Sequence, residues 1–192
     1  MDEIVAAARK GERARLLAAR GAVDAETHAR WSSAISVALR SLLIPFTGRV
    51  FGFYWPHRGE YDPVGIATDV IASGGACALP VVVARKQPLV FRVWHPDAAM
   101  IPGAYSYGIP HPAEGETVIP DVVLVPLVGF DRLGYRLGYG GGYFDRTLAA
   151  ITPRPRTIGV GFELGRLATI DPQPHDIALD VIVTEAGIFP TG

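Results

Sequence analysis

The chain has 192 residues, of which 49% are hydrophobic and 19% charged, and its formal net charge is −1. This length and composition predict a globular protein with a sizeable core rather than a disordered chain. The near-neutral charge gives no electrostatic basis for binding nucleic acid or an anionic membrane, and no apolar run reaches the length of a bilayer-spanning helix. Cys77 is the only cysteine, which excludes an intrachain disulfide. We therefore expect a cytoplasmic enzyme in which Cys77 is a small core residue.

Two helices are expected at the start of the chain. Residues 2–20 are rich in alanine, leucine and arginine, and Asp24 is expected to cap a second helix that ends near Leu43. Arg9 and Arg13 are four positions apart, so they share one face of the first helix. A solvated helix face is the ordinary interpretation of such cations.

Strands and helices alternate through the rest of the chain. Strands are expected at 49–55, 78–84, 89–94, 121–125 and 157–162, with a last one ending at residue 185, and helices at 64–72 and 147–151. Residues 95–120 form a long segment without clear periodicity, which is typical of a functional or mobile loop. The alternation predicts one domain over residues 1–192, a Rossmann-like three-layer α/β/α fold with a mostly parallel central sheet.

The segment from Val128 to Arg146, VGFDRLGYRLGYGGGYFDR, carries the clearest signal of a binding site. Glycine lets backbone N–H groups approach a ligand closely, and a helix that follows adds unpaired N–H donors and a positive dipole end. This combination predicts an anion site, most often one for phosphate. Arg136 and Arg146 flank the loop, and Asp131 and Asp145 are carboxylates suited to Mg²⁺.

Glycine content alone leaves a flexible turn before a helix as an equal alternative. The segment lacks the Gly-Lys-Ser/Thr of a Walker A loop, and Tyr143 stands where a Rossmann fingerprint has its third glycine. The whole segment, however, resembles the pattern P-x-x-x-F-D-x-x-G-x-R-L-G-x-G-x-G-Y-Y-D of the 5-formyltetrahydrofolate cyclo-ligases, also called 5,10-methenyltetrahydrofolate synthetases. The residues in register are Pro126, Phe130, Asp131, Gly134, Arg136, Leu137, Gly138, Gly140, Gly142, Tyr143 and Asp145. Phe144 replaces the second tyrosine of the pattern.

The resemblance implies an enzyme that uses ATP and Mg²⁺ to convert 5-formyltetrahydrofolate to 5,10-methenyltetrahydrofolate. It places Arg136, Tyr143 and Asp145 in catalysis and Asp145 with Asp176 on the metal. For ATP it implies a basic residue of the first helix, which is Arg9 or, in another register, Lys10, together with Arg13. The remaining ATP contacts would come from the loop, namely Arg136, Leu137, Gly138, Tyr139, Gly140, Gly141, Gly142, Tyr143 and Phe144.

For the folate, the resemblance implies contacts from three parts of the chain. Glu60 follows the first strand, and Trp55 lies five positions earlier with a flat face suited to a pterin ring. Tyr107 belongs to a Tyr-Gly-Ile-Pro-His-Pro segment in which His111 stands where many members have an acid. The third group is shared with ATP and comprises Tyr139, Gly140, Gly141, Gly142 and Tyr143.

Two other classes stay open on the sequence. A phosphosugar isomerase or CoA-transferase-like enzyme could use a similar sheet and anion loop without ATP, and a binding protein could keep the pocket without turnover. The expected partners are small molecules only, with no nucleic acid or membrane, and the expected state is a monomer or a weak homo-oligomer.

Overall fold

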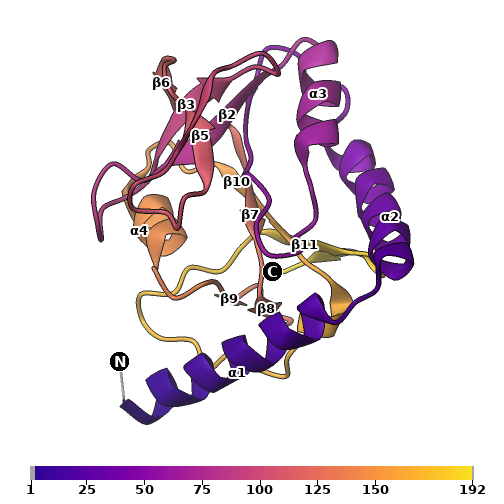
Figure 1. Cartoon of the computed structure of the whole chain (residues 1–192), viewed down its shortest axis with the longest axis vertical. Coiled ribbons are helices and arrows are strands. Elements are labelled where there is room, and N and C mark those ends of the chain that lie inside the picture. Colours follow the sequence, from indigo (N-terminus) through magenta and orange to yellow (C-terminus); the bar gives the residue numbers. More distant parts are fainter. Residues whose placement is uncertain (1–2, 192) are drawn as a thin grey trace.

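The computed structural model describes residues 3–191 and, within them, builds an eight-stranded sheet in the order β12-β11-β10-β7-β1-β2-β3-β6 (Figure 1). Its strands are β1 (Val50–Gly52), β2 (Ala76–Val81), β3 (Val90–Trp94), β6 (Thr117–Val118), β7 (Val122–Pro126), β10 (Arg156–Val160), β11 (Val181–Thr184) and β12 (Gly187–Pro190). Two small hairpins are separate, one of β4 (Met100–Pro102) and β5 (Pro110–Pro112), the other of β8 (Gly129–Phe130) and β9 (Arg136–Leu137). The helices are α1 (Glu3–Gly21), α2 (Ala25–Leu43), α3 (Val64–Ala72) and α4 (Tyr143–Ala150), with a short 3-10 turn, η1 (Glu163–Gly165).

The centre of the sheet is parallel. Strands β2, β1, β7, β10 and β11 run in the same direction, whereas β3, β6 and β12 pair antiparallel at the two edges. The prediction of an α/β fold with a mostly parallel sheet is confirmed.

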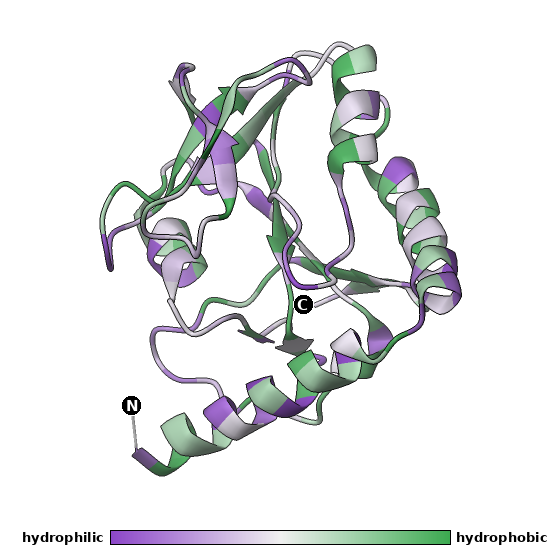
Figure 2. Ribbon diagram, in the orientation of Figure 1, coloured by the Kyte–Doolittle hydropathy of each residue, from purple (hydrophilic) through white to green (hydrophobic). Residues whose placement is uncertain are grey.

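Alternating residues of the central strands make two cores, one on each face of the sheet. Val122 and Leu124 of β7 belong to the cluster that includes residues of α2 and α3. Val123 and Val125 face the other way, into the cluster that holds Leu148 of α4. Figure 1 shows α2 and α3 on one side of the sheet and α4 on the other, and the central strands are predominantly hydrophobic in Figure 2. Because both faces are covered, parallel strands such as β7 are hydrophobic throughout.

Helix α1 lies across the end of the sheet rather than on either face (Figure 1). Its buried residues are Arg9, Leu16 and Arg20, which fall on one face because they are seven and four positions apart. Leu16 sits over the backbone of Gly129, where an added Cβ would lie 2.7 Å from a leucine methyl carbon. Arginines are therefore prominent among the residues that α1 buries against the rest of the described chain.

Several elements differ from those that the sequence predicts. The first strand is only three residues long, although Phe53 and Tyr54 are buried in the core beyond it. Strand β2 begins two residues earlier than expected, and α4 begins four residues earlier, at Tyr143. The segment 95–120 contains β4, β5 and β6, and the hairpin β8–β9 and strand β12 were not expected. These strands have two to four residues each, which is too short to show a period of two. Asp2, the expected first residue of the N-terminal helix, lies outside the described residues.

Candidate active site

The candidate site lies where the order of the parallel strands reverses. Strand β1 pairs with β2 on one side and with β7 on the other, so the segments that leave the carboxyl ends of β1 and β7 diverge. Open α/β sheets bind ligands in the crevice at such a switch point. Here the chain after β1 leads to Glu60, and the chain after β7 leads through the β8–β9 hairpin to residues 138–142, which we call the glycine loop.

A tight turn in the β8–β9 hairpin precedes Arg136 and the glycine loop. Asp131 is buried, and its carboxylate accepts hydrogen bonds from the backbone N–H groups of Leu133, Tyr135 and Ile170. Gly134 has φ +83° and lies against the carbonyl of Leu179, so only glycine fits there. The Phe-Asp-x-x-Gly part of the motif thus has a structural role, because both carboxylate oxygens of Asp131 accept hydrogen bonds that stabilise the turn.

The glycine loop has the form expected of an anion site. Gly140 and Gly142 have φ values of +93° and +62°, and α4 begins directly after Gly142 without a side-chain cap. The first N–H groups of such a helix have no partner inside the helix. Arg13 Nε donates to the carbonyl of Gly138 at 2.8 Å, and Arg146 donates to that of Gly141. Two guanidinium groups therefore border the loop.

Arginines outnumber carboxylates around the glycine loop. In the described chain, Arg9, Arg13, Arg136 and Arg146 lie there with three carboxylates, those of Asp145, Asp176 and Glu60. Arg136 is buried, and burial lowers its pKa in spite of the nearby Asp145. Its Nη2 lies 3.0 Å from Asp145 Oδ1 without the alignment of a hydrogen bond, and the buried Nε of Arg146 has no acceptor among residues 3–191. Buried donors of this kind are costly unless an acceptor arrives, so the site is suited to an anion.

The structure brings Asp145 and Asp176 to the same place although they are far apart in the sequence. Asp145 Oδ1 accepts a hydrogen bond at 3.1 Å from the N–H of Ile177, the neighbour of Asp176. Asp176 lies 2.5 Å from Arg9 Nη2 and also accepts from Gln173 N–H. Burial alone would raise the pKa of Asp176, but the hydrogen bonds from Arg9 and Gln173 outweigh it and lower the pKa.

Of the two carboxylates beside the glycine loop, Asp145 is the better suited to bind Mg²⁺. Among residues 3–191 no three His, Cys, Asp or Glu side chains converge on one point, but Mg²⁺ needs only one or two carboxylates when phosphate oxygens and waters complete its octahedron. Asp145 Oδ2 accepts no hydrogen bond from any described residue. Asp176 is held by Arg9 and would have to exchange that partner for a metal. Asp180 binds Thr157 at the amino ends of β10 and β11, away from the glycine loop.

Glu60 connects the loop after β1 with the glycine loop. Its carboxylate accepts a hydrogen bond from the hydroxyl of Tyr139 at 2.8 Å and another from the N–H of His57 at 2.8 Å. Burial raises the pKa of Glu60, while the bond from Tyr139 and the charge of Arg20 act against that rise. The loop after β1, which the sequence assigns to folate, and the glycine loop, which it assigns to both ATP and folate, are therefore in direct contact.

The other residues expected at the site lie in varied surroundings. Trp55 is half-buried against the core on the side of α2 and α3. Tyr107 is 81% exposed with φ +56° in the turn between β4 and β5, and within the described chain no hydrogen bond or ring contact links it to the glycine loop. Leu137 is buried in β9, and the ring of Tyr143 lies against Gly141 and under Arg146. Phe144, in the first turn of α4, packs against the core on that side of the sheet. Lys10 is exposed.

Arg20 is a residue that the sequence did not assign to the site. Its guanidinium donates to the carbonyls of Arg58 and Leu127 and to the hydroxyl of Tyr139. Its spacing of eleven positions from Arg9 puts both residues on one helical face. This spacing is the sequence feature that could have assigned Arg20 to the site.

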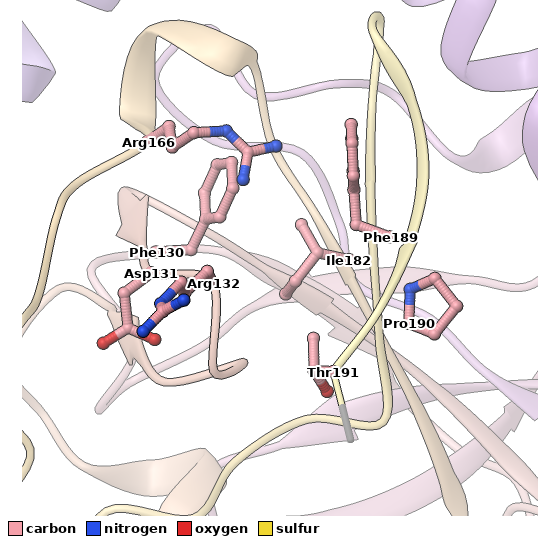
Figure 3. A pocket seen from close by; sticks show the side chains of 8 residues that line it. All are labelled: Phe130, Asp131, Arg132, Arg166, Ile182, Phe189, Pro190 and Thr191. Atoms are coloured by element: carbon pink, nitrogen blue, oxygen red, sulfur yellow. The ribbon is translucent and has the colours of Figure 1, made fainter.

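A small cavity of about 180 Å³ lies behind the turn of Asp131 (Figure 3). It is lined by Phe130, Asp131, Arg132, Arg166, Ile182, Phe189, Pro190 and Thr191. Arg166 lies over the rings of Phe130 and Phe189. Of the residues expected at the site it includes only Asp131, whose carboxylate is occupied by backbone N–H groups, and it is smaller than the roughly 300–1,000 Å³ of typical ligand pockets. We interpret it as loose packing between the hairpin and strands β11 and β12.

The fold and the loop define a doubly wound α/β protein with a glycine loop at its switch point that is suited to an anionic ligand. The family model for the 5-formyltetrahydrofolate cyclo-ligase family matches residues 5–185. A protein of Mycolicibacterium smegmatis named 5-formyltetrahydrofolate cyclo-ligase is 31% identical over 160 residues, which cover 77% of this chain and 80% of that protein. The chain therefore belongs to the 5-formyltetrahydrofolate cyclo-ligase family.

Solved structures agree with this assignment. The structure of Aquifex aeolicus 5,10-methenyltetrahydrofolate synthetase is 29% identical and superposes with a TM-score of 0.80, covering 95% of this chain and 92% of that one. The synthetase of Mycoplasma pneumoniae, 23% identical with a TM-score of 0.75, covers 96% and 99% of the two chains and supports the fold.

Proposed function

We propose that this protein catalyses the ATP-dependent conversion of 5-formyltetrahydrofolate to 5,10-methenyltetrahydrofolate, with release of ADP and phosphate. Membership of the family supports the reaction. The observation that carries it at the level of residues is the surplus of guanidinium groups around the glycine loop. Among the described residues, the buried Nη2 of Arg136 has an ion pair with Asp145 but no hydrogen-bond acceptor, and the buried Nε of Arg146 has no acceptor either. A triphosphate would supply the missing acceptors and the missing negative charge.

The proposed chemistry has two steps. The formyl oxygen attacks the γ-phosphorus of ATP, so the bond from that phosphorus to the bridging oxygen breaks and ADP leaves. Nitrogen 10 of the folate then attacks the activated carbon, loses its proton, and phosphate leaves. Phosphoryl transfer of this kind depends on positioning and on neutralising charge.

The chain's own residues would supply that positioning. Backbone N–H groups of the glycine loop and of the first turn of α4 would hold phosphate oxygens. Arg13, Arg136 and Arg146 would neutralise charge from three directions, and Tyr143 would close the end of the loop, against which its ring already packs. Glu60 would orient the folate, with Trp55 and Tyr107 as further candidates on that side.

Mg²⁺ would be held by Asp145, and by Asp176 once Arg9 turns from that carboxylate toward the phosphates. When bound, the ion would neutralise phosphate charge and orient the transferred group. In this proposal Arg9 and Asp176 exchange their present ion pair for contacts with phosphate and metal, which reconciles both predicted roles with the pairing seen in the structure.

One assay tests the proposal. Purified protein with ATP, Mg²⁺ and 5-formyltetrahydrofolate should form the absorbing methenyl product, and omission of ATP should abolish it. Arg136→Gln should reduce the rate strongly. Arg154→Gln is the matched control, because Arg154 also pairs with an aspartate but lies half-exposed beside Asp180. Turnover without ATP would favour the isomerase or transferase class, and binding of both ligands without product would favour the binding protein.

We also propose that residues 1–192 form one cyclo-ligase domain that works in the cytoplasm as a monomer or weak homo-oligomer. In the described chain no helix is long and apolar enough to cross a membrane. Light scattering and cell fractionation test the assembly state and the location.

A further inference from the structure

Arg20 occupies an unusual position at the end of α1. Its side chain is buried, and its three donors reach three different segments. Nε donates at 3.0 Å to the carbonyl of Arg58 in the loop after β1, and Nη1 donates at 3.2 Å to that of Leu127 after β7. Nη2 donates at 2.6 Å to the hydroxyl of Tyr139 in the glycine loop. One guanidinium thus joins both sides of the switch point.

The charge of Arg20 is balanced only through Tyr139. No carboxylate of the described residues lies within ion-pairing distance of Arg20, whereas Tyr139 donates its own proton to Glu60 at 2.8 Å. The three side chains form a chain in which a cation donates to a phenol and the phenol donates to a carboxylate. Burying a cation without a direct counter-ion destabilises the folded state, and an apolar residue would fill the same space with a smaller loss of stability. This arrangement is poorly explained by stability alone.

The hydroxyl of Tyr139 is fixed from two sides. It accepts from Arg20, and its proton can be directed to Glu60 or, at a longer 3.4 Å, to the carbonyl of His57. Burial raises the pKa of Tyr139, so the phenol stays protonated and remains a donor. A ligand that takes a hydrogen bond from Tyr139, or that donates to the same oxygen of Glu60, would compete with the contacts that tie the glycine loop to Arg20 and Glu60.

From these contacts we propose that Arg20 is a positioning residue that couples the two substrate sites through Tyr139 and Glu60. A folate seated against Glu60 fixes Tyr139 and, with it, the backbone of the glycine loop that receives ATP. By thermodynamic reciprocity, ATP strengthens folate binding by the same factor. The inference rests on the proposed function for the identity of the two ligands, and it adds a coupling that this function does not require.

The measurement is the dissociation constant of a non-hydrolysable ATP analogue, with and without saturating 5-formyltetrahydrofolate, in the presence of Mg²⁺. We expect folate to tighten binding of the analogue at least about fivefold in the wild-type protein, which is the lower end of measured couplings. In Tyr139→Phe the ratio should fall to within about twofold of one, because only the hydroxyl is lost. In Arg20→Lys the ratio of the two dissociation constants should fall in the same way, because one ammonium group cannot reach all three acceptors.

Two controls separate coupling from support of the fold. Arg15→Lys alters an exposed arginine of the same helix, whose ion pair is with Glu12, and should leave the ratio unchanged. The double variant Arg20→Lys, Tyr139→Phe should match the single variants, because both interrupt one chain of hydrogen bonds. Thermal unfolding of each variant shows whether any loss of stability accompanies the change in ratio.

The outcomes are distinct. A wild-type ratio near one overturns the coupling, and so do variants that lose stability or turnover while keeping the wild-type ratio, since Arg20 would then only brace the fold. Effects that multiply in the double variant would mean that the two residues act separately. A wild-type protein that binds both ligands with coupling but forms no methenyl product would refute the proposed function alone, and one that binds neither ligand would refute both.

Discussion

Replacing Arg9 by alanine should destabilise the protein by about 3 kcal/mol. The guanidinium is 7% exposed, and it donates to the carbonyls of Ile170 and Asp171 and to both oxygens of Asp176. Removing one partner of a buried ion pair costs about 3–5 kcal/mol, because the other charge stays buried. Asp176 would keep its hydrogen bond from the N–H of Gln173, which places the expected loss at the lower end of that range.

Thermal unfolding measures this loss directly. For a chain of this size, 1 kcal/mol shifts Tm by about 2–4 °C, so Arg9→Ala should lower Tm by roughly 6–12 °C. Lys10→Ala is the matched control, because Lys10 is the next residue and is exposed; its effect should stay within about 0.5 kcal/mol. If Arg9→Ala unfolds at the wild-type temperature, the reasoning that Arg9 stabilises the loop of residues 170–176 is wrong. Arg9 would then retain only its proposed role in binding ATP.

Three further predictions concern the turn, the metal and pH. Gly134→Ala should lower the free energy of unfolding in urea by about 3 kcal/mol, because a Cβ at φ +83° would lie 2.6 Å from the carbonyl oxygen of Leu179. The control Gly138→Ala, where the added Cβ has open space around it, should lower it by less than about 1 kcal/mol. Asp145→Asn should lower turnover and raise the Mg²⁺ concentration needed for half-maximal rate; an unchanged metal titration would remove Asp145 from the metal site. Burial raises the folded-state pKa of Glu60 above its ordinary 4.5, so ionising Glu60 costs stability as the pH rises above that ordinary value. The free energy of unfolding of Glu60→Gln in urea should therefore increase relative to that of the wild type as the pH rises from below 4.5.

The regular elements with strong local signals were predictable from the sequence. Helices α2 and α3 and the buried strand β7 fall within about two residues of their expected bounds, because caps, helical periodicity and continuous apolar runs are local properties. The start of α4 was set too late, since Tyr143 and Phe144 were assigned to the loop and not to a helix. Gly142 in the left-handed conformation begins that helix without the usual capping side chain.

The candidate site was predictable where its residues are consecutive and not where they meet across the fold. The glycine loop is visible in composition and motif alone. The ion pair of Arg9 with Asp176 joins residues 167 positions apart, so a single sequence could not reveal that each partner already satisfies the other. Arg20 was passed over because an arginine on a helix is usually solvated, and its burial depends on the position of α1 across the end of the sheet.

The placement of α1 also has a consequence for how the protein folds. Apart from the hydrogen bond of Arg20 to Arg58 and the pair of Arg15 with Glu12, the contacts of its arginines span 107 to 167 positions of sequence. Such distant contacts form slowly because the intervening chain must first be ordered. During synthesis α1 emerges first, yet its partners near Leu127, Gly138 and Ile170 emerge last. Helix α1 must therefore stay undocked until the sheet is complete, and the arginines that later become buried, Arg9 and Arg20, remain in water until then. Docking of α1 would then be a late step in folding, and the ATP site and the native fold would be completed together.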